Sequence, residues 1–138
     1  MILDAKSVQD LIPQKNPFVM VGELIIAEEN KLETNFIVNQ DNVMVENGVF
    51  STPGLIENIA QTCATGFGYI AKQNGEQPKI GFIGSISKLK AHKNPKVGQK
   101  INTIIEVVTT FANITLIKGV NYVDGDVLVE CEMKIVIT

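Results

Sequence analysis

The chain has 138 residues, a net charge of -3 at pH 7 and 45% hydrophobic residues, which suits one domain with an ordinary core. The opening MILDAKSVQD lacks the apolar run of a signal peptide, and no apolar stretch reaches the roughly 18 residues of a membrane span. We therefore expect a single domain over residues 1–138 in a soluble, cytoplasmic protein. The acidic balance argues against nucleic-acid binding.

A short helix and a β-hairpin are predicted at the start of the chain. Apolar residues at positions 8, 11 and 12 indicate one helical turn, which Pro13 ends. The run FVMVGELIIA over 18–27 predicts a mostly buried strand, and the alternating residues of 31–38 predict a second strand. A polar turn separates the two, so we expect them to pair.

The strongest local signal predicts one long helix from about Pro53 to Gln73. Ser51 or Thr52 suits the N-cap and Gly75 suits the stop. Apolar residues recur at steps of three and four along the segment, and small residues among them would let a sheet curl closely around the helix. The polar stretch 39–48 before it predicts a functional loop or a short helix.

The second half of the chain predicts four strands, at roughly 79–91, 99–110, 113–123 and 127–137. Asp124-Gly125 favours a hairpin turn between the last two. One long helix covered by one curved antiparallel sheet is an α+β architecture, and the hotdog fold is the economical arrangement of these elements.

Four blocks of the sequence carry a resemblance to a known family. They are LIPQKNPFVMVGELI, GLIENIAQTCA, GFIGSISKLKAHKNPKVGQKI and VDGDVLVECEMKI. In the same order, they resemble the N-terminal block "LPH-x-x-PF-x-x-VD", the central-helix block "IIEALAQ-x-x-A", a strand–connection–strand block and the final hairpin of the 3-hydroxyacyl-[acyl-carrier-protein] dehydratases. The similarity covers nearly the whole chain.

The resemblance implies an enzyme of fatty-acid-type metabolism that acts on thioesters of acyl carrier protein or coenzyme A. It implies a hotdog homodimer, or a dimer of dimers, with an acyl tunnel at the subunit interface. A histidine and a carboxylate from opposite subunits would form the catalytic pair. Glu57 matches the family's helix carboxylate, but NVMVENGVFSTPG, which corresponds to the family's "GHFPGHPVMPG" loop, has no histidine.

Dehydration requires removal of the C2 proton and protonation of the departing C3 hydroxyl. We expect Glu57 to serve as acid or base and the amides of Gly54 or Leu55, at the helix start, to stabilise the thioester oxygen. Asn47 and Gln61 are further candidates for substrate binding. Neither a metal nor a cofactor is expected.

Other interpretations of these residues stay open. Glu57, placed in the first helical turn, would also complement the helix dipole, and Gln61 would equally suit a solvated helix surface. Asn42, Asn47 or Ser51 could position a water, and Glu46 could replace the histidine as base. His92, the only histidine, suits a solvated loop or strand end. The two cysteines suit the core.

All twelve basic residues are lysines, and residues 77–105 contain no acidic residue. One face or rim should therefore be positive. The lysines are either a solvated face or, for Lys88, Lys90, Lys93 and Lys96, a docking rim for phosphopantetheine and an acidic carrier protein or for the phosphates of coenzyme A.

Three functions follow. The chain is a hydroxyacyl-thioester dehydratase, a non-catalytic acyl-thioester-binding or partner subunit that meets its histidine in a second protein, or a carboxylate-dependent thioesterase, since hotdog folds host several chemistries.

Overall fold

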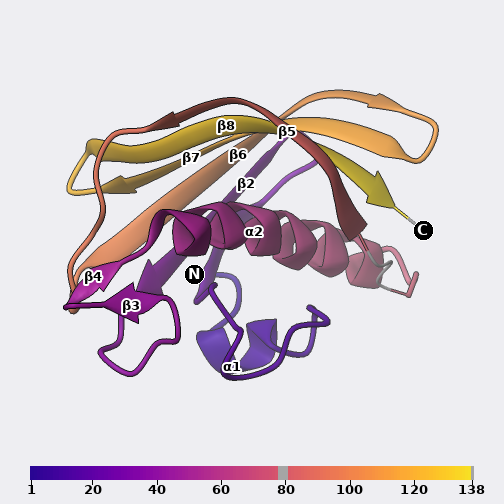
Figure 1. Ribbon diagram of the computed structural model, residues 1–138. Helices are drawn as coiled ribbons and strands as arrows, with labels where there is room; N and C mark the ends of the chain where they lie inside the picture. Colours follow the sequence, from indigo (N-terminus) through magenta and orange to yellow (C-terminus); the bar gives the residue numbers. More distant parts are fainter. Residues whose placement is uncertain (78–80, 138) are drawn as a thin grey trace.

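The computed structural model describes residues 1–77 and 81–137 and shows an antiparallel sheet arched over one long helix (Figure 1). Across the sheet the order is β1 (Leu24–Ala27), β2 (Lys31–Ile37), β6 (Lys100–Phe111), β7 (Ile114–Val123), β8 (Asp126–Ile137) and β5 (Gly81–Ala91). The predicted α+β architecture is confirmed. The predicted strand over 79–91 begins at residue 81 within the described residues, and positions 79 and 80 lie outside them.

The long helix, α2 (Thr52–Gln73), matches its predicted bounds within one residue. Ser51 is the N-cap, and its side chain accepts a hydrogen bond from the amide of Gly54. Leu55, Ile59 and Cys63 are buried beneath the sheet with the core residues of β6, β7 and β8. Neither helix in the described part of the chain combines the length and the apolarity needed to cross a membrane.

Glycines let α2 and the sheet approach each other closely, as the small residues of the helix predict. A Cβ atom added to Gly66 of α2 would overlap the side chain of Leu32 on β2, and one added to Gly119 of β7 would overlap Ile59 of α2. At each glycine a large apolar side chain of the facing element therefore packs directly against the backbone. These two contacts fix where the helix lies across the sheet.

The predicted strand over 18–27 is wrong in its first half. Val19, Met20 and Val21 are buried as expected, but β1 begins only at Leu24. The reason lies in α2, because the backbone of Met20 bonds to helix side chains: its N–H donates to Oε1 of Gln61 at 2.7 Å, and its carbonyl accepts from Nδ2 of Asn58 at 2.7 Å. Tertiary hydrogen bonds take the place of ladder bonds there.

The stretch before α2 contains no helix, so that alternative was wrong. Two short strands, β3 (Val45–Glu46) and β4 (Val49–Phe50), pair around Asn47 and Gly48, which both have positive φ, 54° and 77°. This is the two-residue turn that suits a tight hairpin. The amide of Phe50 donates to the carbonyl of Pro95 at 2.9 Å, so the hairpin is fastened to the connection between β5 and β6.

The N-terminal segment lies on the side of α2 that faces away from the sheet (Figure 1). It contains the predicted single turn of helix, α1 (Ala5–Val8), which ends at Val8 and not at the predicted stop before Pro13; the Asp4 side chain caps its start. Hydrogen bonding to the amide of Ser7 lowers the pKa of Asp4. The segment thus covers the face of α2 that the sheet leaves free.

Candidate functional site

A cavity of about 240 Å³ lies against one stripe of α2. The helix contributes Glu57, Ala60, Ala64 and Phe67, at spacings of three and four residues. At 1.5 Å per residue this stripe is about 15 Å long. The other walls come from the N-terminal segment and from one end of β5 and β8, with Leu11, Gln14, Phe82, Ile83 and Ile135 among the lining residues. The cavity is a mainly apolar slot with few polar groups.

Glu57 is the carboxylic acid in the described lining of this cavity. It is half-buried, and its Oε1 accepts a hydrogen bond from Nε2 of Gln61 at 2.9 Å. The described helix has no acidic residue in its first turn, so the expected first-turn position of Glu57 was wrong. Because the dipole acts mainly within the first turn, the cavity and not the helix end defines the surroundings of Glu57.

Gln61 is buried, which excludes the solvated-surface interpretation. Its amide makes three contacts: Oε1 accepts from the Met20 N–H, while Nε2 donates to the carbonyl of Phe18 at 2.9 Å and to Glu57. Gln61 therefore holds the N-terminal segment against α2 and orients the Glu57 carboxylate at the same time. A direct contact with substrate stays a prediction.

Gly54 and Leu55 are buried at the start of α2. Their amides donate to Oγ and to the carbonyl oxygen of Ser51, at 3.3 and 3.1 Å. A Cβ atom on Gly54 would lie 2.7 Å from Cζ of Phe50, so glycine is required for packing as well. The bond from Gly54 to Ser51 is long, and such bonds are weak. The role of both amides toward a thioester oxygen stays a prediction.

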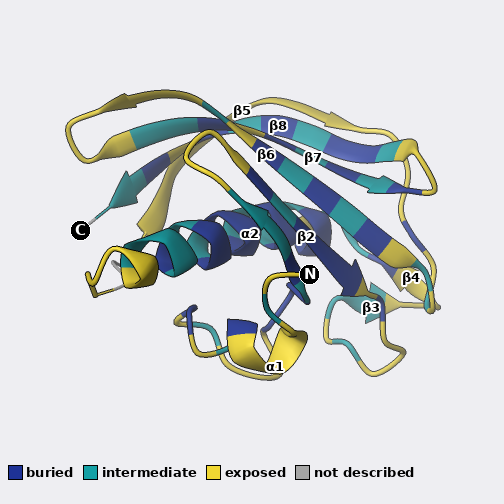
Figure 2. Ribbon diagram, turned by 180° about the vertical axis from the view of Figure 1, so that it is seen from behind, coloured by how far each residue is buried: buried dark blue, intermediate teal, exposed yellow. Residues whose placement is uncertain are grey.

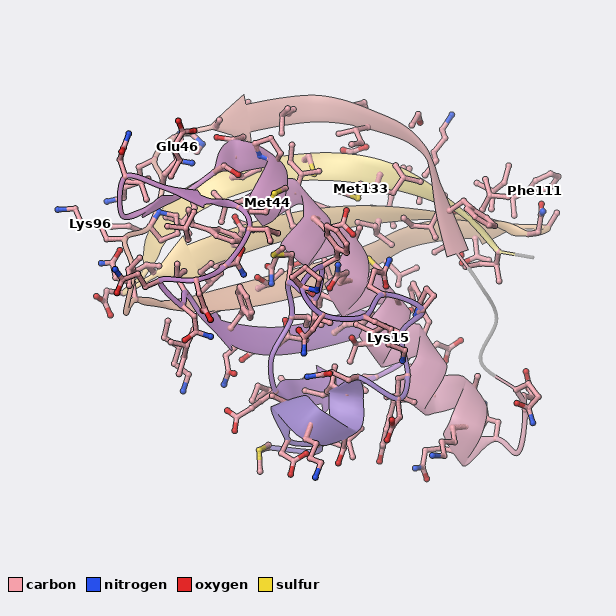
Figure 3. The ribbon with its side chains drawn as sticks, turned by 60° about the horizontal axis from the view of Figure 1, so that its bottom comes forward. Lys15, Met44, Glu46, Lys96, Phe111 and Met133 are labelled. Atoms are coloured by element: carbon pink, nitrogen blue, oxygen red, sulfur yellow. The ribbon has the colours of Figure 1, made fainter. Side chains whose placement is uncertain are left out.

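The hairpin before the helix does not bring its polar side chains into the cavity. Asn47 is exposed at the tip, and Glu46 is exposed beside it. Figure 3 places Glu46 and Lys96 at the same end of the molecule, with Phe111 at the other end. Asn42 supports the backbone, since its Oδ1 accepts from the Met44 amide at 2.8 Å. The substrate-binding role of Asn47 therefore stays a prediction.

The lysine-rich interval meets acidic residues of β8. Lys88 pairs with Glu132 at 3.2 Å and Lys93 with Asp126 at 2.6 Å. Lys90 stands opposite Glu130 in the strand register. The fold thus balances part of the charge that the sequence places in one run. Docking by Lys88, Lys90, Lys93 and Lys96 stays a prediction.

His92 lies outside the cavity lining, and the two cysteines are buried. Nε2 of His92 lies 3.2 Å from Oε2 of Glu130 at the surface, as a strand-end histidine is expected to. Cys63 lines the cavity, and burial, with a smaller effect of Cys131, raises the pKa of its thiol. Burial raises the pKa of Cys131 to about 11. Both thiols stay protonated and serve as apolar wall and core.

A buried polar network supports the site from behind, and the sequence did not reveal it. Asn58 donates to the Met20 carbonyl and accepts from the hydroxyl of Thr103. Nδ2 of Asn121 donates to the Leu55 carbonyl at 3.0 Å, and its Oδ1 accepts from the Val129 amide at 3.1 Å. Polar residues inside otherwise apolar strand and helix patterns were the available signal.

A second groove, of about 810 Å³, lies between the N-terminal segment and the end of β2. Its lining includes Glu23 and Asn35, which bond to each other at 2.8 Å, but not Glu57. Within residues 1–77 and 81–137, no three His, Cys, Asp or Glu side chains gather as metal ligands would.

Known proteins resemble this chain in sequence over almost its full length. The 3-hydroxyacyl-[acyl-carrier-protein] dehydratase FabZ of Oceanobacillus iheyensis is 28% identical over 99% of both chains. That of Clostridium botulinum is 30% identical over 98% of this chain and 96% of its own.

Solved structures share the fold. The dehydratase heterocomplex ApeI:P from Xenorhabdus doucetiae contains a chain that matches with a TM-score of 0.88, at 17% identity, over 100% of this chain and 93% of its own. A hypothetical thioesterase from Streptococcus pneumoniae, solved with coenzyme A, matches with a TM-score of 0.68 at 11% identity over 84% of each chain. The hotdog fold is thereby confirmed.

The family model "ApeP-like: ApeP dehydratase" matches residues 6–136. With the full-length similarity to the FabZ enzymes, this confirms the resemblance that the four sequence blocks carry. The chain therefore belongs to the ApeP-like dehydratase family.

Proposed function

We propose that the chain binds a 3-hydroxyacyl thioester and takes part in its dehydration, with the acyl chain in the cavity along α2. The observation that carries this proposal is the cavity itself, an apolar slot with the Glu57 carboxylate in its wall. The apolar stripe of Ala60, Ala64 and Phe67 suits a hydrocarbon chain, and the Glu57 carboxylate suits proton transfer at the reacting carbons. The cytoplasm is the location we propose.

In the proposed reaction the C2–H and C3–O bonds break, a C2=C3 double bond forms and water leaves. Glu57 accepts the C2 proton and returns a proton to the departing hydroxyl, so one carboxyl group serves as base and then as acid. Gln61 keeps the carboxylate oriented through the 2.9 Å hydrogen bond. The amide N–H of Gly54 would donate a hydrogen bond to the thioester oxygen in place of Oγ of Ser51.

A second chain completes the site in this proposal. The edge strand β5 is exposed along its whole length and carries Phe82, Ile83, Ile86 and Leu89; its outer position is visible in Figure 2. A long apolar edge strand normally needs cover. We propose a dimer through β5, which would also extend the cavity at Phe82 and Ile83. Acyl carrier protein or coenzyme A would carry the thioester.

The test is a steady-state assay of a 3-hydroxyacyl carrier-protein substrate. We expect the unmodified chain to turn over, and Glu57→Gln to lower kcat/KM by about 10²-fold or more, because the acid and base function is lost. Glu29→Gln, in the exposed turn between β1 and β2, is the matched control and should match the unmodified chain. Equal activity of Glu57→Gln and the parent would contradict the role of Glu57.

One observation favours a second candidate, a partner subunit. The loop before α2 has no histidine, and His92 pairs with Glu130 away from the cavity. The similar chain from Xenorhabdus doucetiae was solved in a heterocomplex. Binding of the thioester without turnover, with activity appearing only when a histidine-bearing homologue co-purifies, would favour this candidate over the homodimeric enzyme.

A further inference from the structure

One buried polar atom in the cavity wall has no partner within the protein. Oε1 of Gln14 is closed off from solvent, and nothing in the described ranges 1–77 and 81–137 donates a hydrogen bond to it. An unpaired buried acceptor costs folding free energy, and native proteins retain few of them. Gln14 lines the same cavity as Glu57, and its side chain is only partly buried, so a turn of its amide group would bring Oε1 to a ligand in that cavity.

The surrounding segment holds Gln14 in place without satisfying it. Pro13, just before it, has no N–H to offer. The ammonium group of Lys15, just after it, lies 3.0 Å from the carbonyl oxygen of Gln9 and 3.5 Å from that of Ile12. Gln61 fastens the chain a few residues further on, at Phe18 and Met20. The acceptor is thus presented by a chain segment anchored on both sides.

The chemistry of the ligand decides what this acceptor can bind, and here the inference rests on the proposed function. In a 3-hydroxyacyl thioester the hydrocarbon has no polar group, and the thioester oxygen and sulfur only accept hydrogen bonds. The 3-hydroxyl is the one donor of the acyl part. We propose that Oε1 of Gln14 accepts a hydrogen bond from this hydroxyl, so that the cavity selects 3-hydroxyacyl over saturated acyl chains.

This contact is compatible with the departure of the hydroxyl group. The hydroxyl hydrogen points to Gln14, which leaves the oxygen lone pairs free to take the proton from Glu57. The water that leaves therefore remains bonded to Gln14 until it exits. A saturated chain offers no donor and leaves the acceptor unpaired, which is how a polar pocket rejects an analogue that lacks one hydroxyl.

The experiment compares two ligands on one protein. Calorimetric titration measures the binding of 3-hydroxyoctanoyl-coenzyme A and of octanoyl-coenzyme A to the Glu57→Gln chain, in which elimination is suppressed. We expect the hydroxylated ligand to bind at least about tenfold more tightly. Adding Gln14→Leu should reduce this ratio to about one. Gln9→Leu, the same change on the same segment but in the lining of the other groove, should leave the ratio unchanged.

The ratio separates recognition from structural damage, because a distorted cavity weakens both ligands alike. The melting temperature of the Gln14→Leu protein should equal or exceed that of its parent, since an unpaired buried acceptor is removed. A ratio that survives Gln14→Leu, or that is about one before the substitution, overturns the inference and leaves the proposed function intact. Failure of both thioesters to bind the parent overturns the proposed function itself.

Discussion

At the scale of single residues, the site depends on amide side chains that bond to backbone. Asn58 and Gln61 of α2 together hold the N–H and the carbonyl of Met20. Both are buried, and Asn58 also meets the Thr103 hydroxyl. Unpaired buried polar groups lower the stability of a fold, so these hydrogen bonds stabilise the arrangement around Glu57.

Replacement of Asn58 tests how much these hydrogen bonds stabilise the protein. We expect Asn58→Ala to lower the free energy of unfolding by about 2–4 kcal/mol, since the Met20 carbonyl and the Thr103 hydroxyl both lose a partner and a small void remains. Urea denaturation measures it, with the midpoint shifting at constant slope. Gln73→Ala, at the exposed end of the same helix, should change stability by less than about 0.5 kcal/mol. Similar losses for the two variants would contradict the network.

The residues of the candidate site were only partly predictable from the sequence. Glu57 was found through its sequence block. Gln14 and Asn58 were not found, because the burial of a polar residue can be recognised only when its neighbours in the fold are known. The acidic partners of the lysine interval were not predictable for the same reason, since Glu132 and Asp126 are distant from it in sequence and adjacent in the fold.

At the scale of elements, the contact of α2 with the sheet is set by interlocking shapes. Gly66 receives Leu32, and Gly119 receives Ile59. Glycine inside a helix costs up to about 1 kcal/mol relative to alanine, so its presence at residue 66 reflects space and not helix formation.

We therefore expect Gly66→Ala to destabilise the protein by about 1–3 kcal/mol, because overpacking outweighs the gain in helix propensity. Thermal or urea unfolding checks the sign. In a Leu32→Val background the cost should be smaller, because the overlapping Cδ atoms are gone. An equal cost in both backgrounds would show that the helix backbone, and not Leu32, opposes the added methyl group.

The helix and the long strands were predictable because each carries a local signal: a cap, a proline at the start, or strict alternation around a tight turn. Asp124-Gly125 is an example, since it does connect β7 and β8. The start of β1 and the β3–β4 hairpin were not predictable. In the first case helix side chains replace the sheet as hydrogen-bond partners, and in the second a polar stretch depends on the connection at Pro95.

At the scale of the whole molecule, the two edges of the sheet differ. β1 is a strand of four residues next to the N-terminal segment, whereas β5 has 11 residues, all of them exposed. Short edges resist further pairing and long apolar ones invite it. The proposed dimer therefore uses β5.

A lysine in this edge should separate the subunits. We expect the unmodified chain to have twice its mass of 15.1 kDa in analytical ultracentrifugation, and Ile86→Lys to weaken association more than about tenfold, because burial of an unpaired charge costs several kcal/mol. Ile114→Lys, at a similarly exposed isoleucine of β7, should remain dimeric. Dissociation by Ile114→Lys alone would place the interface at the turn between β6 and β7 and not on β5.

The amide of Gln61 has a consequence for how this chain can change over evolution. One side chain fastens the segment before β1 and orients the carboxylate of Glu57. A substitution that loosens the first function also disturbs the second. Variation at this position is therefore constrained by both functions. A substitution that frees the segment before β1 would also change the surroundings of Glu57, and one that changes those surroundings would also require new anchors for the segment.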